Sequence, residues 1–177
     1  LGIEPADSQF AYALKKFIEV KNKIYAKDQQ EYTDFLFNLE TISSFSCMDE
    51  LIKVAKSQDG VQGVVFGRVD FSGSLGLSRS AIDSESITRY VVSTAEACKV
   101  NGLEFVVGGA VAIASLPELR KVKQALLTRF ETRKVIFAGD ALDNPQIMNG
   151  LKETVHFELL WLQNKRDYYA DIQREDA

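Results

Sequence analysis

The sequence predicts an α/β fold built around a parallel sheet, and two observations lead to this prediction. Short apolar segments, typical of strands buried on both faces, alternate along the chain with longer segments of helical period. No linker, low-complexity segment or internal repeat interrupts the alternation, and 177 residues are enough for one domain with a sizeable core. We therefore expect a single domain over residues 1–177, in which right-handed crossovers join parallel strands.

The first half of the chain predicts three strands and two helices. Residues 1–5 have the character of a strand end, because Pro5 cannot continue the pairing. Residues 8–26 carry apolar side chains at helical spacing, with Asp7 or Ser8 as the capping residue. The other elements of this half are a strand, a helix and a strand, expected at residues 35–39, 49–56 and 61–69.

The second half continues the alternation and ends in a long helix. One helix starts at Ser84 or Ser86 and stops at Asn101-Gly102, a typical C-terminal cap. Ser115 and Glu118 form a capping box for the next helix, which we expect to extend to about Phe130. The remaining elements are two strands and the final helix, expected at residues 104–109, 134–140 and 145–173.

Composition excludes several classes of protein. A formal net charge of −4, with basic residues scattered among acidic ones, argues against a nucleic-acid partner. No apolar run approaches the length of a membrane span, and no basic-then-apolar leader is present, so we expect no membrane partner. Cys47 and Cys98 have no metal-binding spacing and predict free thiols in a reducing, cytoplasmic compartment.

Periodicity alone leaves two parallel-sheet folds open. An open doubly wound sheet and a (β/α) barrel both fit the order of elements, although five βα units are too few to close a barrel of eight. No strand is followed by a G-x-G-x-x-G or Walker lysine loop, so nucleotide-binding versions lack their main support. Acids at the ends of two consecutive strands, Glu40 and Asp70, favour the barrel, whose sites gather side chains from several strand ends.

Two motifs resemble those of a known family. Asn38-Leu39-Glu40-Thr41 is similar to the strand-ending "I-E-T" element of the HpcH/HpaI aldolase and citrate lyase β-subunit family. Residues 67–76, Gly-Arg-Val-Asp-Phe-Ser-Gly-Ser-Leu-Gly, resemble the "G-x-x-D-L-S-x-S-L-G" element that ends the family's next strand. Residues 4–8 loosely resemble its earlier "P-M-x-E-S" element, with Ser8 matching and Pro5 displaced by one position.

The resemblance implies a TIM-barrel-type fold, a (β/α) barrel in which the five strands correspond to strands four to eight of eight. It implies a divalent metal, Mg²⁺ or Mn²⁺, held by Glu40 and Asp70, although on spacing alone both could equally be capping or surface acids. The family's catalytic arginine comes from an earlier strand that lies outside this chain, so the catalytic residues are unknown. His156, inside the final helix, is expected to have a packing or surface role.

Several residues beside the two acids are candidates for substrate binding. The backbone N–H groups of Ser72, Gly73, Ser74 and Leu75 could cradle a substrate carboxylate, with Gly73 allowing close approach. Arg68 could bind a substrate carboxylate or phosphate, or it could be a structural partner of Asp70 or Glu40. Residues 132–134 precede the last expected strand, which would place them at the end of the sheet away from the site.

The final helix predicts contact with another subunit. Its apolar side chains form one stripe and extend beyond it, and they include Ile147, Leu151, Val155, Leu159, Leu162, Phe157, Leu160, Trp161 and Tyr168. The alternative is a helix buried deeply in its own domain. We expect a homo-oligomer with helix 145–173 at its interface.

The resemblance implies an enzyme, a carbon–carbon lyase of the aldolase type. It would act on a small carboxylate through a pyruvate-type enolate of a 2-oxo acid, with a metal stabilising the developing charge. An acyl-CoA lyase of citryl or malyl type is one alternative. A truncated, non-catalytic barrel fragment that binds metal or carboxylate is the other.

Overall fold

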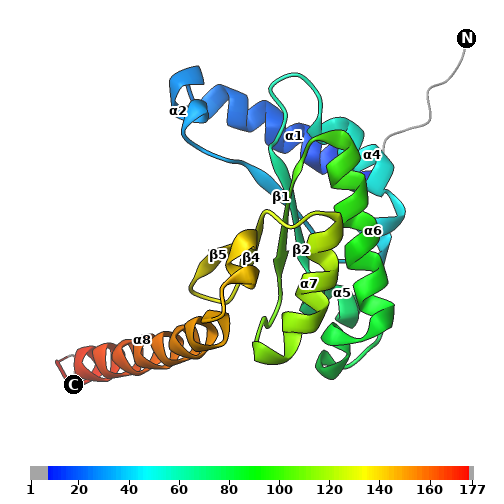
Figure 1. The fold of residues 1–177 in the computed structure, drawn as a ribbon. Coiled ribbons are helices and arrows are strands. Elements are labelled where there is room, and N and C mark those ends of the chain that lie inside the picture. The colour runs from blue at the N-terminus through cyan, green and yellow to red at the C-terminus, as the bar shows by residue number, and fades with distance from the viewer. Residues whose placement is uncertain (1–7, 176–177) are drawn as a thin grey trace, which may run out of the picture.

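The computed structural model describes residues 8–175 (Figure 1). Five strands form one sheet, and helices connect most of them. The strands are β1 Leu36–Leu39, β2 Gly63–Gly67, β3 Glu104–Gly108, β4 Arg129–Glu131 and β5 Ile136–Ala138. The α-helices are α1 Gln9–Ile24, α2 Lys27–Glu31, α3 Ile42–Ser46, α4 Met48–Ala55, α5 Arg68–Ser74, α6 Glu85–Asn101, α7 Leu116–Ala125 and α8 Ile147–Glu175. The 3₁₀ helices are η1 Arg79–Asp83, η2 Ile113–Ser115 and η3 Gly139–Asp143.

The strands lie in the sheet in the order in which they occur along the chain, β1-β2-β3-β4-β5. The first four are parallel, and β5 is antiparallel to β4. Parallel neighbours that follow one another in sequence need a crossover each time, and helices supply it after β1, β2 and β3. The carboxyl ends of β1 to β4 therefore meet at one edge of the sheet.

One face of the sheet carries the core. Helices α4, α6 and α7 lie on this side (Figure 1), and α6 packs on β2 and β3. The strand residues that point toward the helices are fully buried and include Leu39, Val64, Phe66, Phe105, Val107 and Phe130. Because alternate strand residues point to opposite faces, this set fixes the register of every strand.

The opposite face is mixed: the residues between the core positions are the polar Asn38, Glu104, Arg129 and Glu131 and the apolar Leu36, Val65 and Val106. Arg129 pairs with Glu104 and with Asp34 across the strands, at the amino ends. The Glu104 and Arg129 side chains are 37% and 31% exposed, so water reaches this face. The polar side chains of this face lie toward the two ends of the strands, with Val65 and Val106 between them.

The expected α/β class is confirmed, and the expected barrel is not. The fold is α/β with parallel neighbours, but the sheet is open and does not close into a barrel. The strand expected at residues 1–5 lies outside the described residues. The expected fifth parallel unit is wrong, because β5 turns back on β4 as a hairpin with Phe130 and Phe137 stacked 5.0 Å apart. The helix expected to reach Phe130 ends at Ala125, where Leu126 becomes extended.

Other expected elements agree with the structure. Ser84 Oγ accepts the Ile87 N–H at the start of α6, and Gly102 ends this helix in the left-handed conformation, with φ of 67°. Ser8 Oγ caps α1 by accepting the Ala11 N–H. One alternative for the final helix was deep burial in its own domain, and the structure does not show this. Ile147 and Leu151 are buried near its start, whereas its later part projects from the body (Figure 1).

Candidate functional site

Glu40 follows β1 and lies over the end of β2. It stands between the last strand residue and Thr41, whose Oγ1 accepts the Ser44 N–H to cap α3. Its Oε1 is 2.7 Å from the point where a Cβ on Gly67 would lie, so only glycine leaves room for the carboxyl group there. Asn38 Nδ2 donates to Glu40 Oε1 at 2.8 Å and fixes its orientation. The sequence folds so that this acid is held on the polar face, at the carboxyl edge of the sheet.

Asp70 comes from the next strand end. Strand β2 ends at Gly67 and α5 begins at Arg68, which places Asp70 in the first turn of α5 with its side chain exposed. Desolvation raises the pKa of Glu40, and the negative charge of Asp70 raises it further. The two carboxylates predicted from the motifs are therefore brought to one place and act on each other.

Glu131 is a third acid at the same edge, and the sequence analysis did not identify it. It ends β4, and its Oε1 is 2.6 Å from the point where a Cβ on Gly108 would lie. Gly108 and Gly67 are register partners in adjacent strands. Glu40 and Glu131 thus approach from β1 and β4, the strands that flank β2 and β3, over a floor of two glycines. Burial raises the pKa of Glu131, and the charge of Glu40 adds to this effect.

The three acids do not form a closed metal cage. Within residues 8–175, no three His, Cys, Asp or Glu side chains are close enough together to hold a metal ion. Glu40 and Asp70 nevertheless offer hard carboxylate oxygens, the donors that Mg²⁺ and Mn²⁺ prefer, and Mg²⁺ commonly keeps several waters beside one or two protein carboxylates. Desolvation is the main cause of the raised pKa of Glu40, and the charge of Asp70 adds to it; a bound cation would offset both effects. The donor set therefore fits a two-carboxylate site.

Arg68 is a structural residue in this conformation. Its side chain is 3% exposed, and its Nη1 donates to Asp83 Oδ1 at 2.6 Å. The other guanidinium donors bond Gly108 O at 3.2 Å and Gly109 O at 3.0 Å. Of the two interpretations left open by the sequence, the geometry favours a structural partner, with Asp83 in place of Asp70 or Glu40. Arg68 therefore fixes the backbone carbonyl groups of Gly108 and Gly109 by these hydrogen bonds.

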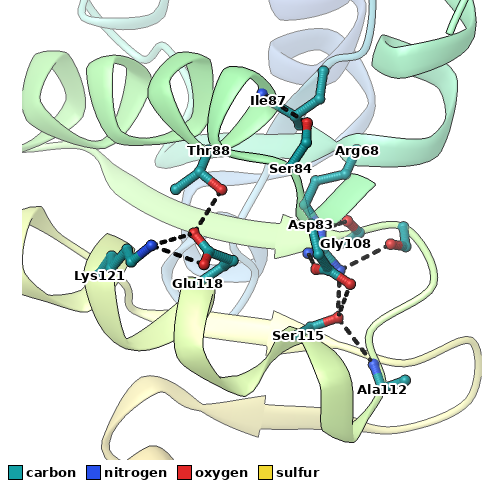
Figure 2. Close-up of polar contacts among 11 residues, drawn as sticks. Arg68, Asp83, Ser84, Ile87, Thr88, Gly108, Ala112, Ser115, Glu118 and Lys121 are labelled. Carbon is teal, nitrogen blue, oxygen red and sulfur yellow. Dashed lines mark hydrogen bonds and ion pairs between the residues drawn. The ribbon is translucent and has the colours of Figure 1, made fainter. Parts of the chain in front are cut away.

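Figure 2 shows how Ser115 completes this buried network. Ser115 Oγ donates to Asp83 Oδ2 at 3.1 Å and accepts the Ala112 N–H at 3.3 Å. The expected capping box of α7 is thus wrong, because the Ser115 hydroxyl is used elsewhere. Glu118 instead accepts from Thr88 Oγ1 and pairs with Lys121. Arg68, Asp83 and Ser115 together tie α5, η1 and η2 into one unit.

The residues expected to cradle a carboxylate form the second turn of α5. They were expected in a glycine-punctuated turn with free N–H groups, and that expectation is wrong, because amides inside a helix bond its own carbonyls. The Leu75 N–H bonds Phe71 O and Ser72 O, and Ser74 Oγ accepts the Ile42 N–H at 2.9 Å. Ser72 is fully buried, and its hydroxyl has no described partner. Gly73 is exposed with open space above it.

Residues 132–134 lie at the site edge and not at the far end. They follow β4, which is parallel to β1–β3, so the hairpin turn leaves from the same carboxyl edge that carries Glu131. The sequence analysis placed them wrongly because it took this segment to begin a parallel strand. Arg133 lies 3.8 Å from Glu158, and Lys134 Nζ lies 3.6 Å from the centre of the Trp161 ring. The turn therefore connects the site edge to α8.

The remaining candidate residues play no part in this edge. His156 is an exposed residue of α8 with Glu153 at 4.0 Å, which agrees with a surface role. Cys47 and Cys98 are free thiols, and burial raises the pKa of Cys98 to about 12, so this thiol stays protonated. No helix within the described residues is long and apolar enough to cross a membrane.

Comparison with models of known protein families finds no match to this chain, and a search among curated proteins finds none. The function is therefore argued from the site and from the two motifs.

Proposed function

We propose that this protein is a metal-dependent aldolase or lyase that forms or breaks a C–C bond through the enolate of a 2-oxo acid. The observation that carries the proposal is the convergence of Glu40 and Asp70 from consecutive strand ends, with Glu131 opposite Glu40 across two glycines. Three carboxylates at the carboxyl edge of parallel strands are typical of a catalytic centre and not of a packing surface.

The chain's own groups have distinct parts in this proposal. Glu40 and Asp70 hold Mg²⁺ or Mn²⁺, which when bound polarises the substrate carbonyl and offsets the charge that develops on its oxygen. Asn38 fixes the Glu40 carboxylate by its hydrogen bond. Glu131, whose pKa is raised, is suited to carry a proton to or from the substrate carbon through its carboxyl oxygen. Arg68 positions the Gly108–Gly109 backbone and does not touch the substrate.

The order of the strands supports a barrel. Four parallel strands follow one another without the reversal that defines a doubly wound sheet, and helices cover one face while the polar face carries the acids. In a barrel the polar face would line the interior, with the acids at its carboxyl end. We propose that the described sheet corresponds to part of a (β/α) barrel, and that the protein acts in the cytoplasm.

Two alternatives differ in what they require. An acyl-CoA lyase of citryl or malyl type would use the same carboxylates on a thioester enolate. A non-catalytic fragment that binds metal or carboxylate is favoured by one observation: Arg68 is committed to Asp83, so it is not free to bind a substrate carboxylate. Enolate stabilisation would then depend on a cationic group outside the described site.

Pyruvate release tests the proposal. The full-length gene product is incubated with 4-hydroxy-2-oxo acids of different chain length, with and without Mg²⁺ or Mn²⁺, and pyruvate is measured. We expect metal-dependent release that is lost in Glu40→Gln and Asp70→Asn and kept in Glu96→Gln, an exposed acid of α6 that serves as the matched control. Citryl-CoA and malyl-CoA are assayed in parallel. Metal binding without turnover of either substrate class would favour the non-catalytic alternative.

A further inference from the structure

Strand β1 leaves one edge of the sheet open. It pairs with β2 on one side, and no other strand of residues 8–175 pairs with its second side. In a parallel pair only alternate residues of a strand bond the neighbouring strand, so the outward-pointing N–H and C=O groups of β1 have no strand partner among these residues. Phe37 points toward the helices and is partly exposed, whereas its register partner Val64 is fully buried. Proteins commonly cover such an edge.

An apolar groove of about 360 Å³ lies along this edge, between β1 and α1. The apolar side chains that line it include Phe10, Ala13, Leu14 and Phe17 of α1 and Leu36 and Phe37 of β1. Phe10 and Phe17 are 38% and 45% exposed, so the groove is open to solvent on this side. It is suited to apolar side chains that enter beside β1.

The order of the helices indicates which segment belongs in the groove. Helix α1 packs on α4, α4 on α6, and α6 on α7, so the helical layer repeats the order of the chain. Strand β1 precedes α4, β2 precedes α6 and β3 precedes α7, and each of these helices leads to the next parallel strand. Helix α1 is the first member of this layer and shares its core through Ala11, Leu14 and Ile18. A strand that precedes α1 and pairs with β1 would repeat the same strand–helix–strand unit on the same face of the sheet.

The sequence before α1 fits such a strand. Leu1 and Ile3 alternate with Gly2 and Glu4, and Pro5 ends the pairing. Because alternate strand residues point to opposite faces, the two apolar side chains would enter the groove together, and Glu4 would lie on the opposite face of the sheet.

The chain also enters α1 at the required end of the sheet. The Ser8 N–H bonds Glu50 Oε1 at 2.9 Å, and Glu50 lies in the first turn of α4, the helix that follows β1 and α3. A strand parallel to β1 would end at this carboxyl edge. Residues 6–8 would then form a loop of ordinary length between a strand and the helix that follows it.

We propose that residues 1–5 add to the open edge of β1 as a parallel strand, with Leu1 and Ile3 in the groove beneath α1. In this arrangement the loop that follows the strand, which contains Asp7, lies at the same edge of the sheet as Glu40. The arrangement does not depend on the proposed function.

Cysteine cross-linking of the whole chain tests whether this segment occupies the groove. Ile3→Cys and Ala13→Cys are combined in a Cys47→Ser background, with the buried Cys98 left in place, and a short bismaleimide is added. We expect a cross-link within one chain that forms about tenfold faster than in Ile3→Cys with Tyr12→Cys, the matched control. Tyr12 is the neighbour of Ala13, is 57% exposed and does not line the groove. Equal rates for the two pairs would overturn the proposal, and so would cross-linking between chains, which would assign the groove to a second copy.

Two aspartate substitutions test which side chains face the groove. Ile3→Asp would place a carboxylate among apolar side chains, so the segment should leave the groove and the urea midpoint of unfolding should fall. Gly2→Asp adds the same charge in the same segment on the opposite face, and it should leave the midpoint nearly unchanged. Equal midpoints for the two variants, or a larger fall for Gly2→Asp, would contradict the proposed strand.

Amide hydrogen exchange followed by NMR tests the pairing itself. Alternate amides of residues 36–39 bond β2, and the other amides of β1 depend on a strand at the open edge for their protection. We expect the outward amides to exchange slowly in the unmodified chain and about tenfold faster in Ile3→Asp. Fast exchange of the outward amides in the unmodified chain would show that residues 1–5 do not pair with β1.

Discussion

Glu131 lies over Gly108 in the same way that Glu40 lies over Gly67, each with its Oε1 less than 3 Å from the position of a Cβ on the glycine. The two glycines are register partners on β2 and β3, so the carboxyl groups of β1 and β4 share one floor. Residues of four strands, β1 to β4, therefore meet at one edge of the sheet, and the charge of Glu40 contributes to the raised pKa of Glu131.

Replacing either floor glycine should disturb the site and leave the fold in place. A Cβ at Gly108 would meet Glu131 Oε1 at 2.6 Å, so Gly108→Ala should push this side chain toward solvent; Gly67→Ala should do the same to Glu40. We expect Gly67→Ala to weaken Mn²⁺ binding at least tenfold, measured by titration calorimetry. Gly73→Ala is the control, since nothing lies within 4 Å of its Cβ position. It should bind normally and gain up to about 1 kcal/mol from helix propensity. Normal binding by Gly67→Ala would show that Glu40 is not held in place by Gly67.

The raised pKa of Glu131 predicts the pH dependence of stability. Its folded pKa lies above the ordinary value of 4.5 because of burial and the charge of Glu40. In the window between those two values the folded state binds more protons than the unfolded state, so stability falls as pH rises. Glu131→Gln has no ionisable group at this position, so its stability does not fall in this way as pH rises. In metal-free urea unfolding, its stability relative to the unmodified chain should therefore increase from below pH 4.5 toward neutral pH. A difference independent of pH would contradict the shift.

Arg68 should matter for stability more than any exposed ion pair. Arg68→Met leaves Asp83 without its buried partner and removes donors from two backbone carbonyls. Breaking a buried pair costs up to 3–5 kcal/mol, and because Asp83 is 25% exposed we expect about 3 kcal/mol. Arg89→Met is the control, because its pair with Glu85 is exposed, and it should cost less than about 0.5 kcal/mol. Equal small losses in urea unfolding would show that the network is not structural.

Ser72 offers a test of whether its buried hydroxyl binds substrate, since Ser72→Ala removes this group and keeps the backbone N–H. Its hydroxyl is buried without a described partner, and such a group costs about 1–3 kcal/mol. Ser72→Ala should therefore be neutral or stabilising by about 1 kcal/mol, and it should bind pyruvate as the unmodified chain does. Weaker pyruvate binding with unchanged stability would instead assign Ser72 to the substrate.

The sequence was informative where local chemistry decides structure. The Ser84 cap and the Gly102 stop of α6 were predicted because each acts within one turn. The short apolar run before Glu40 located the end of β1 correctly, and the helix that follows was found from its own period. The run before Asp70 located β2, but the strand ends at Gly67 and not at Val69, because Arg68 already begins α5.

Glu131 was missed because its strand has only three residues. Leu116, Leu119, Val122 and Phe130 continue a helical period, so the pattern gave no sign that Ala125 ends the helix. The pairing of Thr128 with Phe105, through its amide and its hydroxyl, is a long-range contact that no local rule contains. The usable signal was the run of β-branched residues at positions 128, 132, 135 and 136, which is typical of a hairpin.

The most direct test of the central claim is titration calorimetry of Mn²⁺ and Mg²⁺ into the 177-residue chain, together with Glu40→Gln, Asp70→Asn and Glu96→Gln. Circular dichroism of each variant checks the fold. We predict one saturable site in the unmodified chain and in Glu96→Gln, with affinity at least tenfold lower in Glu40→Gln and in Asp70→Asn. Absence of saturable binding, or equal affinity in all four proteins, would contradict the assignment of these carboxylates as the metal site.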